Sequence, residues 1–212
     1  MSLPKPGSRS DLAVLLFGGR RAPGPLNGLA AVPVGTTDEI APAVAGARRV
    51  AVVGAQADLA AVLTALLRAE QLDVEVAHVR GWRSARRAVT AAARRVPLIR
   101  DDSATALVGA ALWLPPTGSE ALRGEAVVDD TVLFDGEVTG VRIEPTPSMP
   151  GLRATVLTGL AGRAVRPRRW TGGRAAQLGT TGARVIRDGV AGRREVKRST
   201  FYRNTRGWLR VD

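Results

Sequence analysis

The chain has 212 residues, of which 45% are hydrophobic, so it can bury one sizeable core or two small ones. It has no cysteine, which excludes disulfides, zinc–thiolate sites and cysteine nucleophiles, and its single histidine excludes a histidine-based metal cluster. The net charge is +12. Residues 163–212 contain thirteen Arg and one Lys against three acids, a balance of +11, so residues 1–162 are nearly neutral. This asymmetry indicates an anionic partner.

No stretch approaches the roughly 20 apolar residues that span a bilayer. The short apolar run near the N-terminus, AVLLF, is too short for a signal sequence. We therefore expect a cytoplasmic protein without a transmembrane segment. The Arg-rich, Lys-poor composition is typical of a high-GC genome, so some of the arginines simply form a solvated surface.

The first half of the chain alternates between strand and helix patterns. Apolar or alternating runs predict strands at 12–17, 29–34, 49–54, 72–79 and 96–100. Helical patterns begin after Thr36 or Thr37, at Asp58, at Gly81 (to Arg95) and after Ser103, the last ending at Pro115-Pro116. Strand, helix and strand between 49 and 79 form a right-handed βαβ unit, so we expect a small, mainly parallel α/β layer.

After the proline pair the pattern changes to short β-type runs. These are 126–134, 138–143, 153–158, 183–187, 196–202 and 208–211. Asp135-Gly136 and Asp188-Gly189 are tight-turn signals between them. The fold class predicted is thus α/β, with an N-terminal α/β layer followed by an all-β, sandwich-like C-terminal half. The corresponding domains are 1–116 (α/β) and 117–212 (basic and β-rich).

Several motifs have a structural interpretation that outweighs a chemical one. Gly54 follows a strand, as in a dinucleotide loop, but G-x-G-x-x-G is absent and Asp58 would repel phosphate, which favours a plain strand-to-helix turn. The pairs Asp101-Asp102 and Asp129-Asp130 could hold magnesium, but no third acid has a fixed spacing, which favours solvated turns. His78 lies in an alternating strand, which favours a half-buried, hydrogen-bonded side chain over a general base.

The C-terminal arginines are the strongest functional signal. Arginine binds phosphates bidentately, and aromatic faces can stack on bases or lie at a membrane interface. The candidate phosphate-binding residues are Arg166, Arg168, Arg169, Arg193, Arg194, Lys197 and Arg198, and the candidate stacking residues are Trp170 and Tyr202. A solvated arginine-rich surface, a nucleic-acid site, an anionic-lipid site and a site for a phosphorylated ligand all remain open.

Residues 33–41, PVGTTDEIA, resemble the P-x-G-T-x-N-D-x-A segment of the diacylglycerol kinase and NAD kinase superfamily. The resemblance implies an α/β domain followed by a β-sandwich domain, with Gly35, Thr36 and Asp38 near a nucleotide site between the two. The terminal strands, with their Asp188-Gly189 turn, are also similar to those of the family. The family's G-G-D-G-T phosphate loop should precede this segment and is missing. The nearest sequence, residues 101–105 (DDSAT), follows it, so kinase activity is not expected.

Our first hypothesis is a degenerate lipid-kinase-like protein whose Arg-rich C-terminal half binds a phosphate-bearing ligand or an anionic surface. A second is a nucleic-acid-binding protein that uses the basic strands with Trp170 and Tyr202. A third is a non-enzymatic structural or interaction protein with an acidic protein partner. Enzymatic activity stays open, and no cofactor or metal is assigned.

Overall fold

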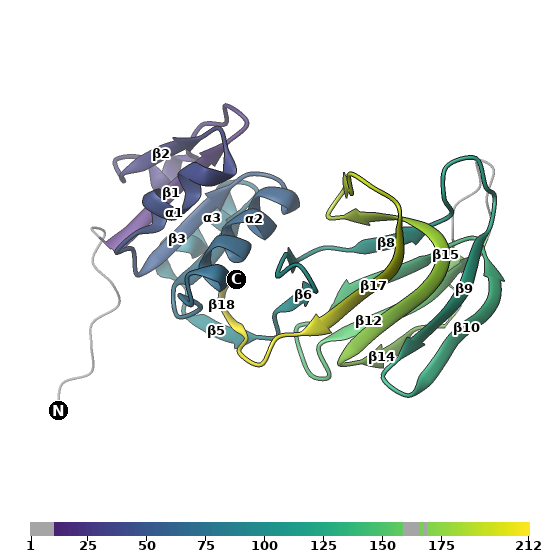
Figure 1. Cartoon of the computed structure of the whole chain (residues 1–212). Coiled ribbons are helices and arrows are strands. Elements are labelled where there is room, and N and C mark those ends of the chain that lie inside the picture. The colour runs from purple at the N-terminus through teal and green to yellow at the C-terminus, as the bar shows by residue number, and fades with distance from the viewer. Residues whose placement is uncertain (1–10, 159–165, 168) are drawn as a thin grey trace. The chain divides into compact units, whose positions relative to one another are not determined.

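The computed structural model describes residues 11–158, 166–167 and 169–212, and the chain divides into two compact units (Figure 1). Unit 1 comprises residues 1–96 together with 206–212, and unit 2 comprises residues 97–205. The sequence predicted a division at 116/117, with all later residues in the β half. In the structure the segment 97–116 belongs to unit 2, and the last strand returns to unit 1.

Unit 1 is built on a six-stranded sheet. Its order is β2 (Ala31–Val34), β1 (Leu12–Phe17), β3 (Arg49–Val53), β4 (Glu75–Val79), β18 (Trp208–Val211) and β5 (Ala93–Val96). Every neighbouring pair is parallel except β18 with β5. The predicted mainly parallel layer is therefore confirmed. The strand predicted at 208–211 is present, but it lies in this sheet and not in the β-rich half.

Helices cover both faces of the sheet, because its central strands are apolar on both sides. On one face, η2 (Gly24–Leu26) and α3 (Trp82–Thr90) share a core with Ala51 and Val53. Strand alternation turns the buried Val50 and Val52 to the other face, which belongs to η3 (Thr37–Glu39), α1 (Ile40–Val44) and α2 (Gln56–Arg68). None of the described helices is long and apolar enough to cross a membrane.

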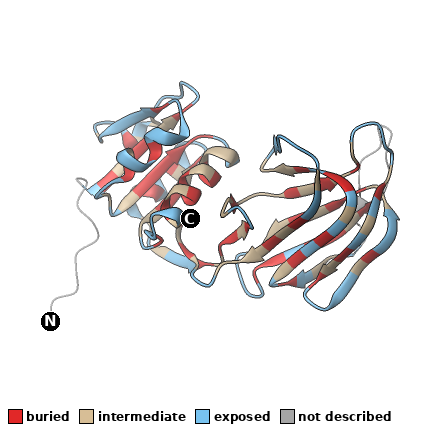
Figure 2. Ribbon diagram, in the orientation of Figure 1, coloured by how far each residue is buried: buried red, intermediate tan, exposed pale blue. Residues whose placement is uncertain are grey.

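Unit 2 is all-β, as predicted for the second half. Its strands are β6 (Ile99–Asp101), β7 (Ala106–Leu107), β8 (Ala111–Leu114), β9 (Leu122–Val128), β10 (Thr131–Val138), β11 (Val141–Pro145), β12 (Leu152–Thr158), β13 (Arg166–Pro167), β14 (Thr171–Gly173), β15 (Ala175–Arg187), β16 (Val190–Ala191) and β17 (Val196–Arg203). They form one twelve-stranded sheet, and its residue pairings are antiparallel. Buried and exposed residues alternate along its strands (Figure 2).

The long strand β15 organises this sheet. One half of β15 pairs with β9 and β17, and the other half pairs with β8. The core that the sheet encloses contains Trp113 and Phe201, both fully buried, with ring centroids 6.0 Å apart. The indole Nε1–H of Trp113 donates to the Ser199 hydroxyl at 2.9 Å, so the polar atom of this core residue has a partner.

Three local predictions were wrong. The helix predicted after Ser103 is instead β7 and β8: Ala111 and Trp113 are buried while the residues between and after them are half exposed, which is a strand pattern. The helix predicted to reach Arg95 ends at Thr90, and β5 follows it. Asp135-Gly136 lies inside β10, and the hairpin turn is at Asp129-Asp130.

The other predicted tight turn is confirmed. Asp188 and Gly189 have φ of 49° and 86°, and they join β15 to β16. Positive φ at both central residues fits a two-residue hairpin loop.

Candidate functional site

The carboxyl ends of β1, β2, β3 and β4 lie at one edge of the parallel sheet in unit 1. In open α/β sheets this edge is the usual location of ligand sites, because loops and helix N-termini present backbone N–H groups there. The turns that leave these strands begin at Gly18, Gly35, Gly54 and Arg80. This carboxyl edge is therefore the candidate position of a nucleotide-phosphate site.

The segment that resembles the kinase motif is closed by its own carboxylate. Glu39 Oε2 accepts hydrogen bonds from the backbone N–H of Gly35 at 2.7 Å and of Thr36 at 3.3 Å. These hydrogen bonds lower the pKa of Glu39. Thr36 and Asp38 are exposed. The N–H groups that could face a phosphate at Gly35 and Thr36 therefore already have an anionic acceptor.

Two further turns on this edge are capped in the same way. Asp58 Oδ2 accepts a hydrogen bond from the N–H of Ala55 at 2.7 Å. The same oxygen lies 2.4 Å from the position that a Cβ atom at Gly54 would take. The Ser84 hydroxyl accepts from the N–H groups of Arg80 at 2.9 Å and Gly81 at 3.1 Å. Gly54 thus begins a plain strand-to-helix turn, and three of the four turns are satisfied internally.

His78 is half-buried and hydrogen-bonded through both ring nitrogens. Its Nε2 lies 3.0 Å from the Gly54 carbonyl, and its Nδ1 accepts from Arg80 Nε at 3.2 Å. A neutral ring protonated at Nε2 fits both contacts. Burial lowers the pKa of His78, which also favours the neutral form. The interpretation of His78 as a structural residue fits this geometry.

Carboxylates in unit 2 also bind their own backbone. Asp101 is fully buried; its Oδ1 accepts from the N–H groups of Ser103 (3.0 Å) and Thr105 (2.9 Å), and its Oδ2 pairs with Arg187 Nε at 2.7 Å. Asp129 accepts from the N–H groups of Arg174 and Ala175, each at 2.9 Å. The first member of each Asp-Asp pair is therefore a loop cap, and the buried Asp101 does not lie in the solvated turn that the sequence favoured.

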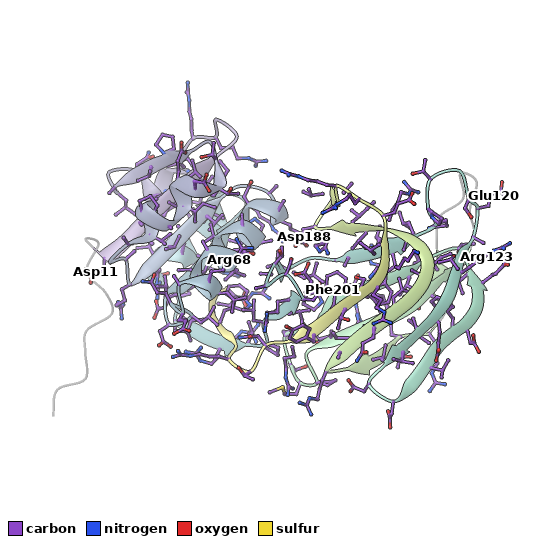
Figure 3. All side chains as sticks on the ribbon, in the orientation of Figure 1. Asp11, Arg68, Glu120, Arg123, Asp188 and Phe201 are labelled. Carbon is purple, nitrogen blue, oxygen red and sulfur yellow. The ribbon has the colours of Figure 1, made fainter. Side chains whose placement is uncertain are left out.

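Asp188 is the third carboxylate of this kind (Figure 3). It accepts from the N–H groups of Val108 at 3.1 Å, Gly109 at 2.6 Å and Ala110 at 3.1 Å. Burial raises the pKa of Asp188 despite these three donors. This side chain fixes the β7–β8 loop to a turn about eighty residues away in the chain. Within residues 11–158, 166–167 and 169–212, no group of three or more His, Asp or Glu could hold a metal ion.

A groove of about 500 Å³ in unit 2 contains one of the predicted arginines. Its walls come from β10, β12, β14 and the residues before β14, and they are Thr131, Val132, Leu133, Val156, Arg169, Trp170, Thr171 and Gly172. Arg169 is exposed, and among the described residues no carboxylate lies within ion-pair distance of it. The side chains of Arg166 and Arg168 lie outside the described residues.

Trp170 is oriented by a residue that the sequence analysis missed. The guanidinium of Arg153 lies 4.2 Å from the centre of the Trp170 ring and pairs with Glu144 at 2.6 Å. Arg142 also pairs with Glu144, at 2.7 Å. Burial opposes ionisation of Glu144, but the two arginines outweigh it and lower its pKa. Glu144 and Arg153 are cross-strand partners in β11 and β12, so only the strand register could have revealed the pair.

The remaining predicted residues lie elsewhere in unit 2. Arg193, Arg194, Lys197 and Arg198 are exposed along the turn before β17 and the start of that strand. Tyr202 lies near the other end of β17, where the Arg100 guanidinium covers its ring at 4.6 Å. It lines a second groove, of about 580 Å³, with Asp129, Asp130, Arg174, Ala175 and Arg203. None of these residues lines the groove that contains Arg169 and Trp170.

The chain thus combines a mainly parallel α/β unit with an antiparallel β unit, and solved structures share this fold. A diacylglycerol kinase from Bacillus anthracis str. Sterne matches with a TM-score of 0.68 at 10% identity, covering 95% of this chain and 96% of that chain. A putative diacylglycerol kinase from the same strain matches with a TM-score of 0.69 at 9% identity, covering 95% and 97%. An NAD kinase from Archaeoglobus fulgidus, in complex with ATP, matches with a TM-score of 0.62 at 10% identity, covering 95% and 93%.

The resemblance to diacylglycerol and NAD kinases is thus confirmed at the level of the fold. No protein-family model matches the chain, and no curated protein sequence matches it. A sequence identity near 10% shows a shared fold and does not show a shared activity.

Proposed function

We propose that this kinase-fold protein binds a phosphate-bearing amphiphile in the groove beside Trp170 and does not transfer phosphate. The observation that supports the proposal is the lining of that groove. One exposed cation, Arg169, adjoins the apolar side chains of Val132, Leu133 and Val156 and the indole of Trp170. An arginine suits a phosphate, and the apolar wall suits the non-polar part of the same ligand.

Loss of kinase activity is supported by the carboxyl edge of unit 1. The sequence has no G-G-D-G-T loop. The N–H groups of Gly35, Thr36 and Ala55 donate to Glu39 and Asp58, whose carboxylates would repel a nucleotide phosphate at the same positions. A nucleotide would have to displace these intramolecular bonds and overcome the repulsion.

The direct test is calorimetric titration with monomeric dioctanoyl phosphatidic acid, with dioctanoylglycerol as the ligand that lacks phosphate. We expect saturable binding of the phosphate form only. Arg169→Ala removes a charge-assisted hydrogen bond and should weaken binding on the order of tenfold. Arg68→Ala, which removes an exposed arginine of unit 1 outside the groove, is the matched control. Equal affinity of the Arg169→Ala variant and the wild type would refute the groove as the site.

Two companion measurements complete the test. Replacing Arg166, Arg168 and Arg169 together by Ala removes two more positive charges and should weaken binding further. It should leave the fold intact, because the core of unit 2 is built from apolar residues. Incubation with ATP, magnesium and a diacylglycerol should give no phosphorylated lipid. Production of phosphatidic acid would overturn the assignment as a non-catalytic protein.

A nucleic-acid function has less support from the geometry. The ring of Tyr202 is covered on one side by Arg100, and its groove contains Asp129 and Asp130, which oppose a phosphate backbone. Oligonucleotide binding with a steep salt dependence would nevertheless favour this alternative. Its loss in Tyr202→Ala with retention in Arg169→Ala would assign it to the second groove.

A further inference from the structure

The two faces of the sheet in unit 1 differ in charge. On one face, residues 18–30, which include η2, and helix α3 contain no acid and five arginines: Arg20, Arg21, Arg83, Arg86 and Arg87. The elements of the other face contain three acids, Asp38, Glu39 and Asp58, and one arginine, Arg68. This local asymmetry is hidden in the near-neutral total of residues 1–162, and it is separate from the basic C-terminal quarter.

Helix α3 presents these charges on its outer side. Ala85 and Ala88 are fully buried against the sheet and η2. Arg49 Nη1 donates to the Ala88 carbonyl at 2.8 Å, which holds the end of the helix to β3. The outward positions are then occupied by Arg83, Arg86, Arg87 and a tryptophan, Trp82, that is 59% exposed.

This arrangement is unfavourable within the protein itself. The first turn of α3 has no acidic residue, so Arg83 stands at the positive end of the helix dipole. Arg83 with Arg86 and Arg83 with Arg87 are neighbours at helical spacing, where like charges repel. Among the described residues, no carboxylate lies within ion-pair distance of Arg83, Arg86 or Arg87. These three arginines are therefore available to an anion that binds from outside the chain.

We propose that the α3 face docks on an anionic phospholipid bilayer. The α3 face is defined as Trp82, Arg83, Arg86 and Arg87 together with Arg20 and Arg21, in the loop that leads into the adjoining η2. The arginines contact lipid phosphates and the indole of Trp82 enters the headgroup region. This site lies in unit 1 and is distinct from the groove beside Trp170.

Two features favour a bilayer over a nucleic acid. Trp82 is exposed among cations, and tryptophan is enriched at membrane–water interfaces because its ring is apolar and its N–H polar. The outer side of a helix is convex, and a flat bilayer surface can contact all its outward side chains together. Single-stranded nucleic acids are instead bound in grooves. Arg86 lies 6.0 Å from the Trp82 ring centre, so the indole and the guanidinium can reach the interface together.

The test is co-sedimentation of the full chain with phosphatidylcholine vesicles, with and without phosphatidylglycerol. We expect binding only to the anionic vesicles. Replacing Arg83, Arg86 and Arg87 together by Ala should lower the partition coefficient on the order of a hundredfold, since each cation near the surface contributes roughly a factor of five. Trp82→Ala should lower it roughly tenfold. Arg68→Ala, which removes an exposed arginine of α2 on the other face of the sheet, should leave it unchanged.

Brominated lipids provide a readout of depth. In a Trp170→Phe background they should quench the emission of Trp82, and the quenching should disappear when Trp82→Phe is added, because the remaining Trp113 and Trp208 are buried. Unchanged circular dichroism excludes misfolding as the cause of any loss. The proposal is overturned if the triple Arg variant binds anionic vesicles like the wild type, or if an oligonucleotide binds through these arginines while vesicles do not. Retention of vesicle binding by Arg169→Ala distinguishes this surface from the proposed groove.

Discussion

The carboxyl edge of unit 1 and the groove beside Trp170 in unit 2 use charge in opposite ways. At the edge, Glu39 and Asp58 bind the backbone N–H groups of their own turns. In the groove, Arg169 is exposed beside an apolar wall without an acidic partner among the described residues. At the carboxyl edge, the backbone N–H groups that could face a ligand therefore donate to the chain's own side chains.

The same contrast extends to other residues of the chain. Asp101, Asp129 and Asp188 each accept hydrogen bonds from backbone N–H groups in unit 2. By contrast, Arg83, Arg86 and Arg169 are exposed, and among the described residues no carboxylate lies within ion-pair distance of them. Carboxylates used as loop caps are not free to bind a metal or act as a base, while exposed arginines remain free to bind anions. The variants below test this division of roles.

The largest expected effect is the loss of the buried cap in unit 2. Asp101→Ala removes the acceptor of the Ser103 and Thr105 N–H groups and leaves Arg187 without its partner, which should cost about 3–5 kcal/mol in the free energy of unfolding. The neighbouring Asp102 is exposed, so Asp102→Ala should change stability by less than about 0.5 kcal/mol. Urea denaturation measures both. Equal costs would contradict the assignment of Asp101 as the cap.

A smaller effect is expected at the carboxyl edge of unit 1. Asp58→Ala leaves the Ala55 N–H without its acceptor at the start of α2 and should cost about 1 kcal/mol. Asp58→Asn keeps an acceptor oxygen and should cost less. The measurements are urea midpoints and the hydrogen-exchange rate of the Ala55 amide. Unaltered exchange in Asp58→Ala would mean that Asp58 does not close this turn.

Arg153→Ala tests how Trp170 is held in the groove. Loss of the guanidinium uncovers one face of the indole and should destabilise unit 2 by about 1 kcal/mol or less, because both partners are partly solvated. Acrylamide quenching of tryptophan emission should increase. Arg142→Ala, which leaves Arg153 paired with Glu144, serves as the control and should not change the quenching.

The smallest effect concerns the pH dependence of the Glu39 cap. Hydrogen bonds hold the pKa of Glu39 below its ordinary value, so its contribution to stability is present above the unfolded-state pKa and is lost as pH falls through the lower, folded-state pKa. The stability difference between wild type and Glu39→Gln should therefore shrink from neutral to acidic pH. Asp38→Asn, which leaves the Gly35 and Thr36 N–H groups untouched, should lack this trend. A pH-independent difference for Glu39→Gln would contradict the cap.

Local sequence patterns were sufficient to predict the parallel layer of unit 1 but not the strand conformation of residues 104–114 in unit 2. The apolar run before Gly54 and the helical stripe after it identify β3 and α2, because their periodicity is set by neighbours along the chain. Residues 104–114 are rich in alanine and look helical, yet the segment is held as β7 and β8 by β15 and by Asp188. Nothing within that segment encodes a cap contributed from so far along the chain.

The candidate groove was predictable only in part. The sequence identified Arg169 as a candidate phosphate-binding residue and Trp170 as a candidate stacking residue. The apolar wall from β10 and β12 and the Glu144–Arg153 pair depend on strand pairing, which periodicity alone does not fix. The turn at Asp129 was likewise displaced in the prediction, because Asp135-Gly136 offers the stronger local signal.

The position of β18 has a consequence for synthesis on the ribosome. Strand β18 lies between β4 and β5, so the sheet of unit 1 remains divided until residues 208–211 have emerged. All of unit 2 is translated before then and needs no residue beyond Thr205. The nascent chain should therefore complete its second unit first and its first unit last, with the exposed edge of β4 as the vulnerable intermediate.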